Sequence, residues 1–232
     1  RGVHGLERRS HGPALLPTGV FQTVPDQMHD AGLQRGVREH RGQGQTNAPR
    51  RILCLGAHCD DIEIGAGATI RTLIAERPSL NVHWVVFSST GLRSVEARAS
   101  ASDFLGGAAA ADVRILGFRD GYFFAEGAAI KRCFEELKDQ VTPDLVLTHY
   151  RDDRHQDHRL ISDLTWNTFR DHLVLEYEVP KFDGDLGQPN WFVPVDDERR
   201  AFKVETLLGR FATQGSKTWF TADTFNALMR IR

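Results

Sequence analysis

From Arg51 onward, short apolar runs alternate with longer amphipathic stretches, and this alternation limits what the chain can fold into. Strand-like runs that alternate with helix-like stretches are typical of βα units and a mostly parallel sheet. We predict strands over 52–56, 81–88, 113–116, 145–148 and 173–178, and helices over 65–76, 94–105, 128–140, 158–170 and 198–211. The sequence therefore predicts an α/β protein with a mostly parallel sheet and helices on both of its faces.

The two ends of the chain differ from this pattern. Residues 1–50 are rich in Gly, Arg, Gln and Pro and follow neither helical nor strand periodicity, so we interpret them as a disordered or spurious leader. The remaining residues, 51–232, fit a single domain. Because the sequence stops at Arg232 within a helical-looking segment without a cap or breaker, we expect this domain to be truncated at its C-terminus.

Charge and cysteine content narrow the classes of partner. The formal net charge of -2 gives no general attraction to nucleic acid, and no apolar run is long enough to insert into a membrane. The three cysteines form no C-x-x-C pair and make a poor disulfide framework. We therefore expect a cytoplasmic protein without a nucleic-acid partner and without membrane insertion, and its oligomeric state stays open.

Two polar clusters follow predicted strands. His58, Asp60 and Asp61 come after the first strand, and His155 and His158 come after the strand 145–148. The i, i+3 spacing of the two later histidines lets them share one face of a helical turn. In open α/β sheets ligands bind beyond the carboxyl ends of the strands, so we expect the clusters to meet there.

The residue types in these clusters suit metal-dependent hydrolysis. A catalytic zinc ion commonly has three His or carboxylate ligands and keeps a fourth position for a water molecule, which becomes the nucleophile. We predict His58, Asp61 and His158 as ligands of one Zn²⁺ per chain, although another divalent metal would also fit. Asp60 is then free to act as general base, and His155 to face the developing oxyanion or the leaving amine.

Neighbouring residues permit two interpretations each. Asp153 either orients a ligand histidine from behind or caps the following helix, and Asp157 either supports the site or is a first-turn helix acid. Arg93 and Glu96 either bind substrate or form an exposed ion-paired helix face, and Trp191 either stacks on a sugar ring or packs in a hairpin.

The motifs resemble those of a known family. Ala57-His58-Cys59-Asp60-Asp61 and His155-Gln156-Asp157-His158 are similar to the A-H-P-D-D and H-x-D-H motifs of the PIG-L/LmbE-like deacetylases, with Cys59 in place of the usual proline. The resemblance runs from about Arg51 to Arg232 and implies a Rossmann-like fold. It also implies the same three metal ligands, Asp60 as general base and His155 as the group that stabilises the tetrahedral intermediate.

The resemblance further implies the reaction. The expected activity is zinc-dependent removal of an N-acetyl group from a small N-acetylglucosamine-type sugar or glycoconjugate. A metal-dependent phosphoesterase is an alternative, although the sequence offers few surplus ligands for a bridged metal pair. A non-catalytic binding protein with a closed four-ligand zinc site is another.

Overall fold

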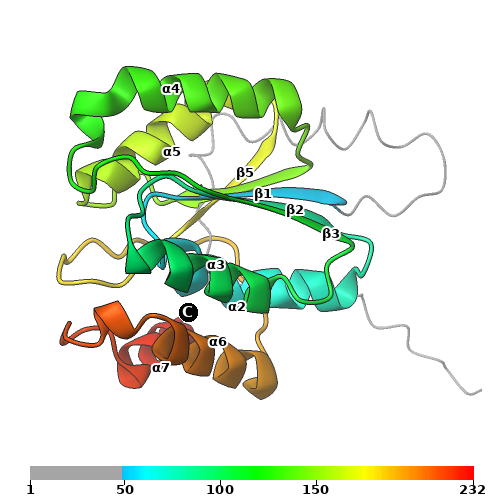
Figure 1. Cartoon of the computed structure of the whole chain (residues 1–232). Coiled ribbons are helices and arrows are strands. Elements are labelled where there is room, and N and C mark those ends of the chain that lie inside the picture. The colour runs from blue at the N-terminus through cyan, green and yellow to red at the C-terminus, as the bar shows by residue number, and fades with distance from the viewer. Residues whose placement is uncertain (1–48) are drawn as a thin grey trace, which may run out of the picture.

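The computed structural model describes residues 49–232 and contains one five-stranded sheet in which every strand pair is parallel (Figure 1). The strands are β1 (Arg51–Gly56), β2 (Asn81–Val86), β3 (Ala110–Ile115), β4 (Leu145–His149) and β5 (Leu173–Tyr177). Their order is β3-β2-β1-β4-β5, so the chain moves outward from β1 to one edge and then returns to its other side. Ligands bind at such a reversal of strand order in α/β proteins.

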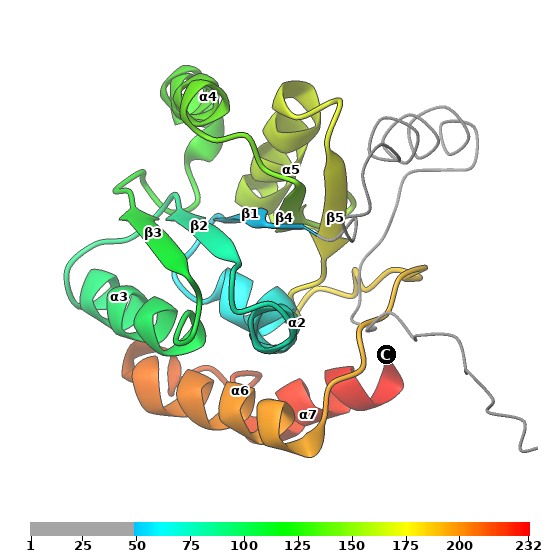
Figure 2. The ribbon, with the colours of Figure 1, turned by 90° about the vertical axis from the view of Figure 1, so that its right-hand side faces the viewer.

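Helices cover both faces of the sheet, as predicted. They are α2 (Asp61–Glu76), α3 (Leu92–Phe104), α4 (Phe123–Gln140), α5 (Gln156–Thr168), α6 (Asp197–Arg210), the short 3₁₀ helix η1 (Ala212–Gln214) and α7 (Ala222–Ile231). One face carries α4 and α5, and the other carries α2 and α3 (Figures 1 and 2). No helix of the described residues is both long and apolar enough to cross a bilayer.

A third helical layer lies outside α2 and α3, where α6 and α7 pack against helices and not against the sheet (Figure 2). The sequence predicted a helix over 198–211 but not this layer. Hydrophobic periodicity identifies which face of a helix is buried and leaves open what covers that face. The final segment is helical, as its sequence indicated.

Two apolar cores lie on opposite faces of β1, because five of its six residues are buried and alternate between the faces. Glycines let α2 approach its neighbours closely. A Cβ atom at Gly65 would lie 2.1 Å from Cδ2 of Tyr177, and one at Gly67 would lie 2.5 Å from Cε1 of Phe104. These positions therefore require glycine, and they hold α2 tightly between the sheet and α3.

Some predicted boundaries were wrong. Helix α2 begins at Asp61 and not at residue 65, and α4 begins at Phe123 and not at residue 128. The first turn of α2 buries Asp61 and Glu63 along with its apolar residues, and the first turn of α4 has one phenylalanine buried and the next exposed. Neither turn therefore shows a plain amphipathic period. Strand β3 also begins three residues earlier than predicted, in an alanine run with little intrinsic strand preference.

All but the last two residues of the predicted leader lie outside the described residues. The leader and the C-terminal truncation therefore stay predictions.

Candidate functional site

The first half of the site is the turn between β1 and α2. His58 and Asp60 lie on this turn, and Asp61 is the first residue of the helix. The turn closes on itself because the backbone N–H of His58 donates a 2.7 Å hydrogen bond to Oδ2 of Asp61. A second bond, from the Ala57 N–H to Nε2 of His149 (2.9 Å), ties the turn to the end of β4.

The second half is the segment between β4 and α5. His155 caps α5, since its Nδ1 accepts a 3.3 Å hydrogen bond from the N–H of Asp157. His158 follows in the first helical turn and is buried. Because β1 and β4 are neighbours in the sheet, both halves meet at one place.

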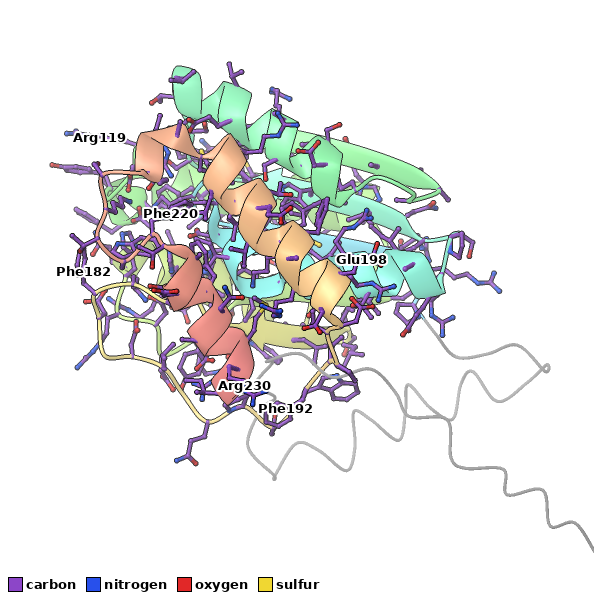
Figure 3. The ribbon with its side chains drawn as sticks, turned by 90° about the horizontal axis from the view of Figure 1, so that it is seen from below. Arg119, Phe182, Phe192, Glu198, Phe220 and Arg230 are labelled. Carbon is purple, nitrogen blue, oxygen red and sulfur yellow. The ribbon has the colours of Figure 1, made fainter. Side chains whose placement is uncertain are left out.

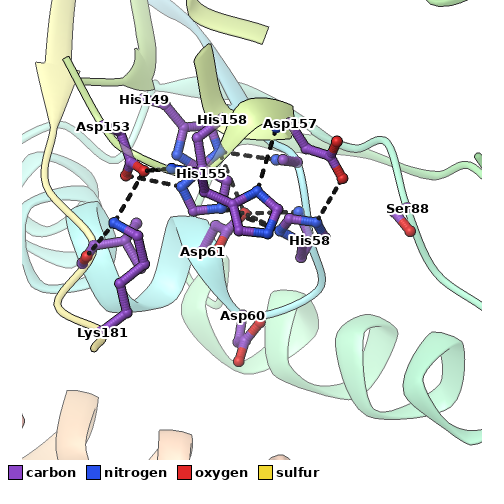
Figure 4. Close-up of polar contacts among 12 residues, drawn as sticks. His58, Asp60, Asp61, Ser88, His149, Asp153, His155, Asp157, His158 and Lys181 are labelled. Carbon is purple, nitrogen blue, oxygen red and sulfur yellow. Dashed lines mark hydrogen bonds and ion pairs between the residues drawn. The ribbon is translucent and has the colours of Figure 1, made fainter. Parts of the chain in front are cut away.

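The three predicted metal ligands come together as a triangle of donor atoms (Figure 4). Nδ1 of His58 lies 3.1 Å from Nε2 of His158 and 3.3 Å from Oδ2 of Asp61. The His158 and Asp61 atoms are 3.4 Å apart. Zinc bonds of about 2.05 Å in a tetrahedron place adjacent ligands about 3.3 Å apart. The donor set and its dimensions therefore fit a zinc ion.

Each of the two predicted ligand histidines has a carboxylate beside the ring nitrogen that does not belong to the triangle. Oδ2 of Asp153 is 2.9 Å from Nδ1 of His158, which is the arrangement that orients a ligand histidine. On the other side, Nε2 of His58 lies 3.1 Å from Asp120 and 3.3 Å from Asp157. Asp157 also accepts hydrogen bonds from the N–H groups of Gly121 and Phe123. It lies in the first turn of α5, as one interpretation predicted, and it is buried beside His58.

Asp153 itself is held by the loop that follows β5. The ammonium of Lys181 lies 2.9 Å from Oδ1 of Asp153 (Figure 4). It also lies 2.6 Å from Oδ2 of Asp185. Asp185 accepts a further 2.7 Å bond from the N–H of Arg154. Burial alone would raise the pKa of Asp153, but the His158 hydrogen bond and the neighbouring cations keep it well below its usual range. Asp153 is therefore a fixed negative charge behind His158.

The adjacent carboxyl groups of Asp60 and Asp61 have surroundings that shift their pKa values in opposite directions. Burial and the charge of Asp61 raise the pKa of Asp60, although the Arg93 guanidinium, 3.0 Å away, opposes this. Burial would also raise the pKa of Asp61, but the surrounding histidines hold it well below its usual range. Asp61 is thus suited to remain an anion, and Asp60 to exchange a proton.

His155 is arranged as a neutral donor. Burial, with the nearby His58, lowers the pKa of His155. Since Nδ1 of the neutral ring accepts from Asp157, its proton resides on Nε2. The ring lies at the edge of the cluster, 4.8 Å from the His58 ring between centroids. A hydrogen-bond donor is therefore available beside the predicted metal position.

Two of the predicted substrate contacts lie apart from this cluster. Both carboxylate oxygens of Glu96 are engaged by Thr213, at 3.0 Å from its N–H and 2.5 Å from its hydroxyl. Trp191 packs, partly buried, against the core on the α2 side. Arg93 does reach the site, where it pairs with Asp60 while its Nε is buried without a partner.

Sequence reasoning missed four residues that contribute to the site: Asp120, His149, Lys181 and Asp185. One donor atom each from Asp61, His149 and His158 lie within 4.8 Å of one another, and the same holds for His58, Asp120, His155 and Asp157. The expectation of few surplus ligands was therefore wrong. Asp120 and His149 were visible as polar residues at the carboxyl ends of strands, whereas nothing in the sequence pairs Lys181 with Asp153.

Fold and site together define an α/β protein with a buried His/carboxylate cluster of metal-binding geometry at the carboxyl edge of its sheet. The family profile described as PIG-L: GlcNAc-PI de-N-acetylase matches residues 53–169, which is half of the chain. The chain therefore belongs to the PIG-L family, a family of amide-bond hydrolases that remove N-acetyl groups.

Solved structures agree on the fold. The chain is similar to the A40926 pseudoaglycone deacetylase Dbv21 (21% identity, TM-score 0.61, covering 76% of this chain and 88% of that one). It is also similar to N,N'-diacetylchitobiose deacetylase from Pyrococcus horikoshii (17%, 0.54, 90% and 86%). A third similar structure is 4-carboxy-2-hydroxymuconate hydratase from Pseudomonas putida KT2440 (20%, 0.57, 78% and 84%), so the fold alone does not fix the reaction. Curated protein sequences give no significant match.

Proposed function

We propose that the protein is a zinc-dependent N-deacetylase of an N-acetylglucosamine-type sugar or glycoconjugate. The observation that carries the proposal is the triangle of His58, Asp61 and His158 donor atoms, with edges of 3.1–3.4 Å, directly beside Asp60. Family membership supports the reaction class. The similarity to two deacetylases of acetylated glycoside substrates supports the sugar-like acceptor.

Each residue of the site has its own role in the proposed hydrolysis. His58, Asp61 and His158 would hold the ion, which when bound acts as a Lewis acid and lowers the pKa of water. Asp60 accepts the proton that the attacking water loses, because burial and the charge of Asp61 raise its pKa, whereas the histidines lower that of Asp61. As the acyl carbonyl becomes an oxyanion, the Nε2–H of His155 donates to it. Asp60 then returns this proton to the leaving nitrogen as the C–N bond breaks, which releases acetate and the amine.

Arg93 takes a role at the same place in this proposal. Its guanidinium keeps the Asp60 carboxylate in position through a 3.0 Å bond, and its remaining N–H groups are available to a substrate hydroxyl. Glu96 and Trp191 stay weaker candidates for substrate contact, because their side chains are engaged elsewhere.

All three cysteines are unpaired, which supports a reducing, cytoplasmic location.

The test is acetate release by metal-loaded protein from a panel of N-acetylglucosamine compounds: the free sugar, a disaccharide, a nucleotide-linked form and a lipid-linked form. Asp60→Ala should abolish release while zinc content stays unchanged, and Asp163→Ala, at an exposed position on α5, should release acetate like the wild type. Release that persists in Asp60→Ala contradicts the assignment of the base. No release of acetate from any compound by folded, zinc-loaded protein contradicts the activity.

A metal-dependent phosphoesterase is a second candidate, and one observation favours it. The overlapping donor groups that include Asp120 and His149 provide more ligands than one ion needs. Metal analysis separates the two functions, because one tightly bound ion per chain supports the deacetylase and two support the phosphoesterase.

A further inference from the structure

A cavity lies between α2, α6 and α7, away from the His/carboxylate cluster. It holds about 190 Å³, and residues 192–195 form part of its lining. Phe192 lies beside the end of α7 when the molecule is seen from below (Figure 3). No residue that lines this cavity belongs to the cluster described above. The cavity is therefore a separate feature of the fold.

One wall of the cavity contains a buried ammonium group. Lys203 of α6 is 4% exposed, and its Nζ donates a 2.5 Å hydrogen bond to the backbone oxygen of Ile64. Among the described residues, no carboxylate forms an ion pair with it. An ammonium has three N–H donors, and a buried charge without a counter-ion costs several kcal/mol.

The other charged groups of the cavity are already paired. Glu178 accepts two bonds from Arg232, at 2.9 and 3.0 Å, and a third from the N–H of Gly187. Arg200 bonds to Asp197 and Asn226. The charge that lacks compensation is therefore that of Lys203.

The remaining walls are largely apolar and include Val193, Pro194, Leu228 and Met229. A cavity of this size is smaller than the roughly 300–1,000 Å³ of sites for drug-sized ligands. It suits a small molecule with one negative group and a short apolar body.

We propose that this cavity binds a small organic monoanion, a carboxylate whose oxygens accept hydrogen bonds from Nζ of Lys203 and whose apolar body contacts Leu228 and Met229. The carboxylate supplies the counter-ion that the fold lacks. Burial lowers the pKa of Lys203 to about 8, so the ammonium is still mostly protonated at neutral pH. This binding site is independent of the proposed deacetylase activity.

The experiment measures thermal unfolding at pH 7 with sodium benzoate as the probe, against sodium chloride at equal ionic strength. Benzamide, a neutral molecule of the same shape, is the control ligand. Benzoate should raise the Tm of the wild type and of Lys138→Met, an exposed lysine on α4, by several degrees, and should not raise the Tm of Lys203→Met. Benzamide should have no effect on any of the three. Benzoate bound at the His/carboxylate cluster would instead raise the Tm of the wild type and of both variants equally.

An equal benzoate shift in Lys203→Met, or no shift in the wild type at saturating benzoate, overturns the proposal. If Lys203→Met does not fold, the comparison of Tm values is replaced by an NMR titration of the wild type with benzoate, in which the lysine Cε signals are followed. Benzoate should then move the Lys203 signal and leave that of Lys138 in place. A stationary Lys203 signal overturns the proposal as well.

Discussion

The protein contains two buried charged regions that are built in opposite ways. At the sheet edge, His58, Asp61 and His158 have further carboxylates around them, and these in turn meet Lys181 or backbone N–H groups. At the α6 cavity, Lys203 has one backbone carbonyl and no carboxylate. The first region is arranged to receive a cation, and the second has an unmatched positive charge. The net charge of -2 conveys neither fact, because each depends on local pairing.

The largest effect is expected at the sheet edge. Asp60→Asn removes the proposed proton acceptor and keeps the shape of the side chain, so kcat should fall about 10²- to 10⁴-fold. Zinc content, measured by mass spectrometry, should be unchanged because Asp60 lies outside the ligand triangle. If zinc is lost in parallel with activity, Asp60 is a ligand and the two adjacent carboxylates have been assigned the wrong way round.

Asp153→Asn tests whether the negative charge beside His158 strengthens metal binding. The amide can still meet His158 but cannot match the Lys181 ammonium or polarise the imidazole. Zinc affinity, measured by competition with a chromophoric chelator, should fall about 10- to 100-fold. Asp139→Asn, at an exposed position on α4, should bind zinc like the wild type. Unchanged affinity in Asp153→Asn would mean that this carboxylate only caps α5.

Removing a charged group at the cavity should stabilise the protein, whereas removing one at the sheet edge should impair zinc binding or activity. Lys203→Met replaces an unpaired buried cation with an apolar side chain of similar length, and it should raise the free energy of unfolding at pH 7 by about 1–3 kcal/mol. Urea unfolding of metal-free protein measures this difference without a contribution from zinc. A destabilised variant would indicate that Lys203 has a partner that offsets its burial.

The pH dependence sharpens this prediction and has the smallest effect. Because burial lowers the pKa of Lys203 from 10.5 to about 8, folded and unfolded chains are both protonated below pH 8, and the wild type bears the full burial cost there. Between pH 8 and 10.5 the unfolded chain binds more protons, so the stability contributed by this group rises with pH. The advantage of Lys203→Met should therefore shrink over this range. An advantage that stays constant would show that the charge of Lys203 is not its source.

The sequence sufficed to predict the parallel sheet with helices on both faces and the centre of the site, but not the outer layer of α6 and α7. Apolar runs such as β1 identify buried parallel strands, and the carboxyl ends of neighbouring strands lie at one edge, so His58 and His158 could be placed together. Their proposed roles as metal ligands rest on the resemblance as well as on the structure. Lys181 and Asp185 could not be foreseen, because their positions depend on the path of an irregular loop. Lys203 could not be foreseen either, since an amphipathic helix normally presents its lysines to water.

The two histidines of the proposed ligand triangle, His58 and His158, are separated by 100 residues of chain. A ribosome that adds about 5–20 residues per second synthesises this interval in roughly 5–20 s. During that time the nascent protein has the β1 turn with His58 and Asp61 but no β4 strand to bring His158 beside it. In the proposed site, metal capture would therefore follow the insertion of β4 next to β1, so metal uptake would report on the strand pairing that joins the two most distant parts of the sequence in the sheet.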